Sequence, residues 1–290
     1  MNIVNMSTRV WLKQFPIMIA VKQKIDSIRY GCDYLICNSM PLFAPYSSGS
    51  YKDRAELTLE AANQSFPLLV HLLDKFKQPR LKIMHAIDFP KDKEDIAAAL
   101  ELKIHLDKNG SNKANRHNYH YIYGPLLRHT TKITAILEIG LGTNNTDVVS
   151  NMGEEGRPGA SMRAFRNYLP NASIYGADID KRILFEETRI KTYFVDQTNI
   201  QSLADLGTKI NEQLDLIIDD GLHSPHANVA VVAFALERLK PGGWLIIEDI
   251  AEAAFPIWEV VAALLPSSYQ AMMIRAEEGL VFAVQNLQHS

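Results

Sequence analysis

Cysteine is nearly absent from this sequence: Cys32 and Cys37 are the only two in 290 residues. So few cysteines exclude a disulfide framework and a cysteine-rich metal site, and a reducing, cytoplasmic setting is expected. The sequence also lacks any apolar run near the ~20 residues that a membrane span needs. We expect no signal peptide, because the apolar stretch 15–21 contains Pro16 and is followed closely by charges.

A strong excess of one charge is lacking as well. Lysine and arginine number 30 against 33 aspartates and glutamates, so the net charge is −3 at pH 7. Because surfaces that bind nucleic acids are basic, no nucleic-acid partner is expected, and no membrane partner either. Apolar residues make up 47 % of the chain, which is ample for a buried core in one large domain or a domain with an attachment.

Residues 1–115 are predicted to form a mainly helical region that serves oligomerisation or covers a substrate. Residues 53–76 have apolar side chains at helical spacing, and Pro67 is expected to kink or divide that helix. Residues 92–106 form a second candidate helix, rich in Ala, Leu and Glu. The polar segment 107–118 is predicted to be a linker or a flexible loop.

Strands and helices alternate from about residue 131, so residues 116–290 are predicted to form one α/β domain. Near-continuous apolar strands between helices indicate a parallel sheet covered on both faces, a doubly wound, Rossmann-like fold. The last two strands form a hairpin, which predicts an antiparallel strand at one edge. Ser224 and Pro225 suit the start of one of the helices. The expected strands are residues 135–140, 173–179, 190–197, 214–221 and 244–249, followed by the hairpin within 270–286.

The turn after the first strand contains Gly140 and Gly142, whose lack of a side chain lets the backbone approach a ligand. This pair alone is equally typical of a tight turn. A dinucleotide site would prefer a third glycine where Asn145 stands, and the Gly-Lys-Ser/Thr of a phosphate loop is absent. Glu138, just before the turn, would repel a pyrophosphate and suits a cationic ligand such as S-adenosylmethionine (SAM).

Acids follow the next two strands at the same edge of the sheet, where such folds bind ligands. Asp178 can accept hydrogen bonds from two ribose hydroxyls, and Asp196 with Gln197 could meet an adenine edge. Each could be an ordinary loop residue, but their occurrence at successive strand ends favours one nucleoside-containing ligand.

Several segments together look like a class I SAM-dependent methyltransferase. Within that class they resemble the metal-dependent macrolide-sugar O-methyltransferases of the mycinamicin type, over roughly residues 117–250. The segments are "HNYHYIY", "LEIGLG", "GASMRAFRNYLPNASIYGADI", "VDQT", "LIIDDGLH" and "LKPGGWLIIEDI". A longer loop after Gly142, and Asn144 at a usual glycine position, depart from the family's pattern.

Three carboxylates are expected to meet at one end of the sheet. Asp220 ends the fourth predicted strand, and Glu248 and Asp249 end the fifth, which is its neighbour in this architecture. Oxygen ligands without cysteine suit Mg²⁺ or Mn²⁺. The resemblance implies that these three bind the metal and that His223 is the catalytic base. The alternatives are a plain strand end for the acids and a helix-start histidine for His223.

The remaining candidates have weaker assignments. Asp219 is expected to back the cofactor pocket, and His226 to be structural or to face substrate. Tyr119, with His117 and Tyr123, is expected on the cofactor or acceptor side, although these tyrosines could equally be core residues.

The resemblance implies a SAM- and divalent-metal-dependent O-methyltransferase that acts on a hydroxyl of a natural product or its sugar. The acceptor would be a macrolide, polyketide, peptide or sugar, and self-association as a homo-oligomer is implied. One alternative is an iron- and oxygen-dependent hydroxylase, which would need His226 or another histidine for its two-histidine, one-carboxylate site. A second alternative is a SAM-binding protein without catalysis.

Overall fold

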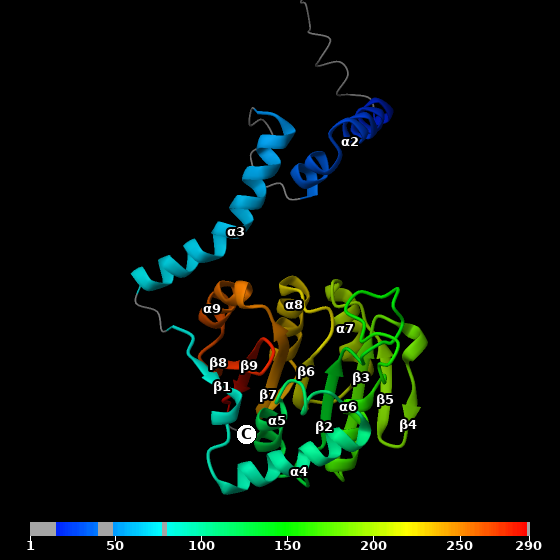
Figure 1. Ribbon diagram of the computed structural model, residues 1–290, viewed down its shortest axis with the longest axis vertical. Helices are drawn as coiled ribbons and strands as arrows, with labels where there is room; N and C mark the ends of the chain where they lie inside the picture. The colour runs from blue at the N-terminus through cyan, green and yellow to red at the C-terminus, as the bar shows by residue number, and fades with distance from the viewer. Residues whose placement is uncertain (1–15, 40–48, 77–79, 289–290) are drawn as a thin grey trace, which may run out of the picture. The chain divides into compact units, whose positions relative to one another are not determined.

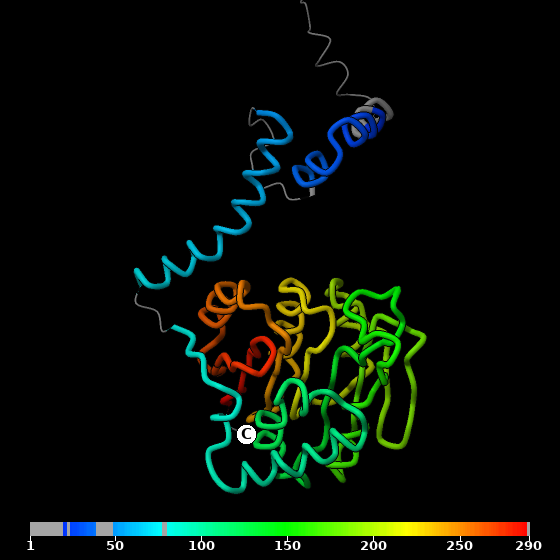
Figure 2. Tube along the Cα trace, viewed as in Figure 1, coloured from blue at the N-terminus to red at the C-terminus, as the bar shows by residue number. Residues whose placement is uncertain are grey.

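The computed structural model describes residues 16–39, 49–76 and 80–288, so part of the stretch bearing on a signal peptide lies outside the described residues. Figure 2 traces the chain through these ranges. The chain divides into two compact units, Met1–Leu72 and Leu73–Ser290. Each unit is described by itself below.

The described part of the first unit is helical, as predicted. Helix α2 (Pro16–Ser39) is interrupted at Gly31, where φ is 52° and ψ is −128°. Helix α3 (Tyr51–Lys75) runs through Pro67 without being divided there. None of the described helices is long and apolar enough to cross a membrane.

The second unit contains a nine-stranded sheet in the order β1-β8-β9-β7-β6-β2-β3-β5-β4 (Figure 1). The mostly parallel α/β fold predicted from the sequence is confirmed, and the five predicted central strands are all present. The strands are β1 (Ile83–His85), β2 (Ala135–Ile139), β3 (Ser173–Asp178), β4 (Glu186–Glu187), β5 (Ile190–Phe194), β6 (Leu214–Asp219), β7 (Leu239–Ile250), β8 (Tyr269–Arg275) and β9 (Leu280–Asn286).

The C-terminal hairpin is not at an edge of the sheet, so that prediction is wrong. Strand β9 pairs antiparallel with both β7 and β8, and β1 then pairs parallel with β8, with Ile83 opposite Met273. Figure 2 shows β1 in cyan beside the orange and red hairpin. Because β1 comes from a region predicted to be helical, a strand beyond the hairpin could not be predicted from the sequence.

Helices cover both faces of the sheet (Figure 1). On one face Leu102, Ile122 and Phe165 from α4, α5 and α6 are fully buried in one core, and α7, α8 and α9 build the other core. The helices are α4 (Lys93–Asn109), α5 (His120–Leu127), α6 (Ala160–Tyr168), α7 (Ile200–Lys209), α8 (Pro225–Leu236) and α9 (Phe255–Leu264), with short 3-10 turns at Ala86–Asp88, Lys181–Ile183 and Glu252–Ala254.

Helix α4 and the turns that follow it belong to the unit that contains the sheet. Asp92 caps α4 by accepting the N–H of Asp95 at 2.9 Å, and Gly110 ends it with a left-handed φ of 78°. Residues 111–118 are then ordered by backbone bonds, and Lys113 is 2 % exposed. The prediction of a linker or a flexible loop at 107–118 is therefore wrong for residues 107–109, which belong to α4, while residues 110–118 form a loop that is partly buried. The sequence-based boundary at residues 115 and 116 falls inside this segment, whereas the two compact units meet at residues 72 and 73.

Replacing Gly124 with alanine is expected to destabilise this packing. A Cβ atom at Gly124 in α5 would lie 2.3 Å from the Cα of Ala99 in α4, so two helix backbones would have to separate. We expect a loss of about 2 to 3 kcal/mol in the free energy of unfolding, measured by urea denaturation. Ile104→Ala, at an α4 side chain that is 65 % exposed, should change it by less than ~0.5 kcal/mol. Equal stability of the two variants would contradict this close packing.

Candidate active site

The carboxyl ends of the central parallel strands meet at one edge of the sheet. Strand β2 lies between β6 and β3, so the chain crosses from one side of the sheet to the other at this point. Ligands in doubly wound folds bind at such a switch. Two cavities open there, and both are lined by residues at the ends of these strands.

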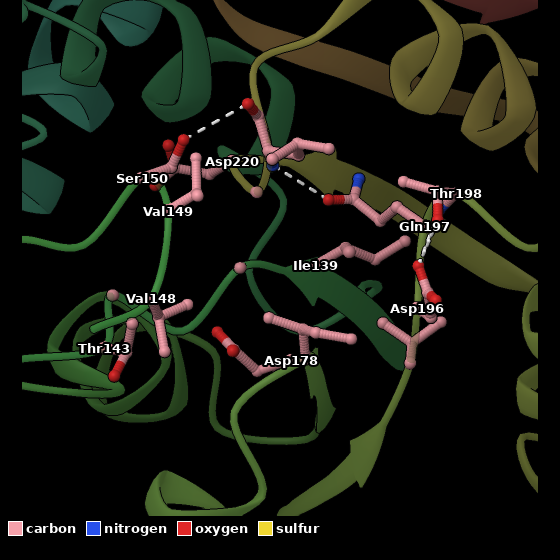
Figure 3. Close-up of a pocket in the computed structure, with 16 residues that line it drawn as sticks. Ile139, Thr143, Val148, Val149, Ser150, Asp178, Asp196, Gln197, Thr198 and Asp220 are labelled. Atoms are coloured by element: carbon pink, nitrogen blue, oxygen red, sulfur yellow. Dashed lines mark hydrogen bonds between the residues drawn. The ribbon is translucent and has the colours of Figure 1, made fainter. Parts of the chain in front are cut away.

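The first cavity, here called the glycine-turn cavity, has a volume of about 350 Å³. It combines apolar walls with polar side chains from the ends of β3 and β5, as Figure 3 shows. The lining residues are Ile139, Gly140, Gly142, Thr143, Val148, Val149, Ser150, Asp178, Ile179, Val195, Asp196, Gln197, Thr198, Asp220, Gly221 and Leu222. Five of the predicted cofactor residues, Gly140, Gly142, Asp178, Asp196 and Gln197, therefore line the same cavity.

The two glycines of the turn are required by close approaches. Gly140 has a φ of 93°, and a Cβ there would lie 2.0 Å from the carbonyl oxygen of Asp220. Gly142 has a φ of 74°, and a Cβ there would lie 2.3 Å from the sulfur of Met152. Any side chain would therefore push the turn away from the end of β6 or from the loop above it.

The acid at the end of β3 is held in place by backbone groups. The carboxylate of Asp178 accepts the N–H of Leu141 at 2.7 Å and that of Asp180 at 2.8 Å. Burial raises the pKa of Asp178, while these two hydrogen bonds act in the opposite direction. Asp178 is 6 % exposed and lines the glycine-turn cavity.

The amide of Gln197 is oriented by two contacts. Its Nε2 donates to Asp219 at 2.6 Å, and its Oε1 accepts the N–H of Leu222 at 2.9 Å. Asp219 is fully buried and also accepts a hydrogen bond from Asn228. It lies behind Gln197 and lines neither cavity. Asp196 uses its carboxylate to accept the N–H of Thr198 (Figure 3).

The second cavity, here called the carboxylate cavity, has a volume of about 480 Å³ and a polar lining. Gly142, Ser150 and Asp220 line both cavities, so the two spaces adjoin at the end of β6. The other lining residues are Asn112, Lys113, Arg116, His117, Tyr119, Asn151, Met152, His223, Glu248, Asp249, Ile250, Ala251, Glu278 and Gly279.

Asp220, His223 and Asp249 converge in this cavity. Each offers a ligand atom within 4.8 Å of the others, which is the geometry of a metal-capable group in the described part of the chain. His223 Nε2 lies 3.9 Å from Asp220 Oδ1 and 3.8 Å from Asp249 Oδ2. The prediction that the ends of the fourth and fifth strands adjoin agrees with the parallel pairing of β6 and β7.

Glu248 lines the same cavity but is almost completely buried. It is 1 % exposed, its Oε2 accepts a hydrogen bond from Lys113 at 2.5 Å, and its Oε1 accepts one from the Tyr123 hydroxyl. Burial raises the pKa of Glu248 well above its usual range, and the charge of Asp220 raises it further. Burial would also raise the pKa of Asp220, but the positive charges of Lys113 and His223 outweigh it and lower that pKa.

Lys113 is the functional candidate that sequence reasoning missed. Its Nζ lies 2.7 Å from Asp220 and 3.2 Å from Glu138, besides its contact with Glu248. Burial would lower the pKa of Lys113, but the three carboxylates outweigh it and hold that pKa well above its usual value. A buried cation was to be expected beside so many buried acids, but nothing in the polar segment marked this lysine among its neighbours.

Two residues predicted to touch the cofactor lie nearer the carboxylates. Glu138 is fully buried, accepts a hydrogen bond from Ser161 at 2.6 Å and lines neither cavity. Tyr119 donates its hydroxyl to Asp249 Oδ1 at 2.5 Å and lines the carboxylate cavity. Strand spacing alone could not distinguish these positions, because both cavities open at the same sheet edge.

The histidines near His223 have different surroundings. His117 is stacked on Tyr119, and its Nδ1 lies 3.7 Å from Asp249. His226 is exposed, and its Nδ1 lies 2.9 Å from the Ser224 hydroxyl. Ser224 therefore occupies the predicted cap position of α8 without making the side-chain cap bond.

Unusual backbone conformations cluster around the carboxylate cavity. In the described residues, the non-glycine residues with positive φ are Asn118, Ser150, Arg189, His223 and Asp249, at 53° to 62°. Three of them line this cavity, and Asn118 follows His117, which also lines it. Such conformations are uncommon and concentrate at functional sites, where the surrounding structure fixes them.

The sequence is similar to natural-product methyltransferases, although no protein-family model matches it. It is 28 % identical to the 8-demethyl-8-alpha-L-rhamnosyl tetracenomycin-C 2'-O-methyltransferase of Streptomyces olivaceus, over 52 % of this chain and 38 % of the relative. It is 32 % identical to the mycinamicin VI 2''-O-methyltransferase of Micromonospora griseorubida, over 34 % of this chain and 24 % of the relative. The matches thus span less than two fifths of these curated relatives.

Among solved structures, the mycinamycin-pathway methyltransferase MycE in complex with Mg and SAH aligns with a TM-score of 0.46 and 25 % identity. The alignment covers 55 % of this chain and 42 % of MycE. Together with the sheet order and the glycine turn, the sequence matches lead to one conclusion. The α/β part of the chain resembles the class I SAM-dependent methyltransferases and, in sequence, the macrolide- and polyketide-sugar O-methyltransferases.

Proposed function

We propose that the protein is a SAM-dependent, divalent-metal-dependent O-methyltransferase that acts on a hydroxyl of a natural product or of its sugar. The observation that carries the proposal is that the glycine-turn cavity and the carboxylate cavity share Gly142, Ser150 and Asp220. A donor in the first cavity and an acceptor in the second would meet at this common wall, where methyl transfer requires their reacting atoms to align.

SAM fits the glycine-turn cavity by the chemistry of its walls. Asp178 would accept hydrogen bonds from ribose hydroxyls, and the fixed amide of Gln197 would meet the adenine edge beside Asp196. The apolar side chains of Ile179 and Val195 line the same cavity and suit the faces of a purine. The glycine turn would let the methionine portion of SAM pass close to the backbone.

The carboxylate cluster consists of Glu138, Asp220, Glu248 and Asp249. A divalent cation fits its outer part, which is the part beside His223. Of the three predicted ligands, Asp220 and Asp249 each have an oxygen that no described donor holds, and His223 Nε2 lies beside both. Mg²⁺ is typically bound through one or two carboxylates while it keeps several waters, and Mn²⁺ accepts the same ligands. Such an ion, when bound, would lower the pKa of an acceptor hydroxyl that it coordinates.

The protein's own groups would then complete the reaction. His223, whose Nε2 lies beside Asp220 and Asp249, would take the hydroxyl proton on that nitrogen. The acceptor oxygen would attack the methyl carbon, so that an O–C bond forms as the C–S bond of the sulfonium breaks. The electron pair of that bond stays on sulfur, which leaves as a neutral thioether, and no covalent enzyme intermediate is needed.

A glycosidic acceptor is the substrate class that we propose. The curated relatives are named for 2'-O and 2''-O methylation in rhamnosyl tetracenomycin-C and mycinamicin VI. The carboxylate cavity also carries hydrogen-bonding side chains away from the cluster, among them Asn112, Arg116 and Asn151. Polar groups at these positions suit a ligand with several hydroxyls.

The test is methyl transfer from radiolabelled SAM to a panel of glycosylated macrolides and aromatic polyketides. We expect SAM binding by calorimetry, product formation with Mg²⁺, loss of at least ~100-fold in rate with EDTA, and recovery when Mg²⁺ is added back. Full activity in EDTA would remove the metal from the proposal. SAM binding without transfer to any acceptor would favour the non-catalytic alternative.

The hydroxylase alternative is disfavoured by the composition of the cluster. In the described residues the metal-capable group holds two carboxylates and one histidine, the reverse of the two-histidine, one-carboxylate set of such oxygenases. His226, one histidine that this alternative would recruit, lies 2.9 Å from the Ser224 hydroxyl. His117, another histidine that lines the cavity, is not part of the metal-capable group. Transfer that proceeds at the same rate without oxygen would exclude it.

A further inference from the structure

A buried ammonium occupies the inner end of the carboxylate cluster. Lys113 is 2 % exposed, and its Nζ lies 2.7 Å from Asp220 Oδ2, 2.5 Å from Glu248 Oε2 and 3.2 Å from Glu138 Oε1. Burying a charge is costly unless it is paired, so a lysine held by three carboxylates has a specific electrostatic role.

The contacts of this lysine divide the carboxylate oxygens into two groups. Both oxygens of Glu248 are engaged, one by Lys113 and one by Tyr123, and Asp220 Oδ2 is engaged by Lys113 as well. Asp249 Oδ1 accepts the hydroxyl of Tyr119. The oxygens left over are Asp220 Oδ1 and Asp249 Oδ2, and these are the two nearest to His223 Nε2.

The charges in the cluster favour the same division of the carboxylate oxygens as the hydrogen bonds do. Glu138, Glu248 and the inner oxygen of Asp220 are compensated by the ammonium. Among the described residues, the outer oxygens of Asp220 and Asp249 have no lysine or arginine beside them, and the basic groups nearest to them are His223 and, at Asp249, His117. Two like charges repel strongly in a buried site, so a divalent ion is driven away from Lys113 and toward the outer oxygens.

We propose that Lys113 is a positioning residue: its ammonium fills the inner end of the cluster and confines a divalent ion to the outer end, at Asp220 and Asp249. Glu248 is then a partner of Lys113 and Tyr123 and not a metal ligand. This assignment rests on the proposed function for the presence of the ion. It places the ion against Asp220, at the wall that the two cavities share, and beside His223.

The direct test is Mn²⁺ binding without SAM or acceptor, followed by the electron paramagnetic resonance signal of free Mn²⁺. We expect Lys113→Met to bind Mn²⁺ at least ~10-fold more tightly than the wild-type protein, because the repulsive charge is removed and inner oxygens become available. An unchanged or weaker affinity in a folded Lys113→Met protein would overturn the proposal. Lys103→Met removes a lysine that is paired with Asp107 on α4 and should leave the Kd unchanged.

A double variant keeps the test decisive if Lys113→Met does not fold. Lys113→Met with Glu248→Gln removes one positive and one negative charge together, so the buried site keeps its net charge. We expect its Mn²⁺ Kd to stay within about threefold of the wild-type value. A loss of ~100-fold or more would identify Glu248 as a ligand and overturn the proposal.

The same measurements distinguish this inference from the proposed function. If the wild-type protein transfers methyl groups in EDTA, the proposed role of the metal is wrong, whatever the Mn²⁺ affinity of the Lys113 variants. If transfer requires Mg²⁺ but the Lys113 variants bind Mn²⁺ no differently from wild type, the proposed function stands and only the role of Lys113 is overturned.

Discussion

Replacing His223 with asparagine is expected to lower kcat for methyl transfer by about 1,000-fold while the Kd of SAM stays within about twofold. His223 lines the carboxylate cavity and is absent from the lining of the glycine-turn cavity. Its loss should therefore slow removal of the proton from the acceptor hydroxyl and leave the binding of SAM unchanged. Asparagine is the suitable replacement because His223 has a φ of 53°, which asparagine tolerates better than alanine. Single-turnover assays with radiolabelled SAM, together with calorimetry, separate the two effects.

His226→Asn is the matched control for this variant. It removes an imidazole three residues away that is exposed and contacts only Ser224 among the hydrogen bonds of the described residues. It should leave kcat within about twofold of the wild-type value. A kcat for His223→Asn within tenfold of wild type would remove His223 as the base. A parallel loss of SAM affinity would instead indicate a structural role at the start of α8.

The central sheet could be predicted because its strands are short apolar runs that end in glycine or acid. All of residues 214–219 except Asp215 are buried, as is expected of a strand covered on both sides, and β6 lies in the middle of the sheet. Strand β1 could not be predicted in this way. It has three residues, is mostly exposed and pairs with Met273 and its neighbours some 190 positions later. Nothing in its own sequence indicates such a partner.

The acids of the candidate site were also accessible to sequence reasoning, since each follows a strand end. The directions in which these acidic side chains point could not be predicted from the sequence. Asp249 and Glu248 are adjacent in the chain and both line the carboxylate cavity, but Glu248 contacts Lys113 and Tyr123 whereas Asp249 lies beside His223. The pairing of β7 with β9 is irregular between Ile247 and Ile250, and Asp249 has a positive φ of 54°, so strand alternation could not predict these directions. The lysine that settles this division lies in a polar segment whose composition predicts a flexible loop. Only the fold brings that segment against the strand ends.

Asp249→Asn should therefore weaken the binding of the divalent ion without disturbing the fold. Asparagine is isosteric, tolerates the φ of 54° at this position and can still accept the Tyr119 hydroxyl on its Oδ1. What it removes is the negative charge of the outer oxygen beside His223. We expect the Mg²⁺ concentration for half-maximal rate to rise at least ~100-fold, measured by titrating Mg²⁺ at saturating SAM.

The control for Asp249 is Glu252→Gln, three residues further along. Glu252 is an exposed acid paired with Arg275 and lines neither cavity, so its loss tests for a general effect of negative charge near the site. It should shift the Mg²⁺ requirement by less than about twofold. An unchanged requirement in Asp249→Asn would mean that the ion is held without this carboxylate. Because Asp249 Oδ2 and Asp220 Oδ1 are the two carboxylate oxygens that lie beside His223 Nε2, the outer position would then be untenable.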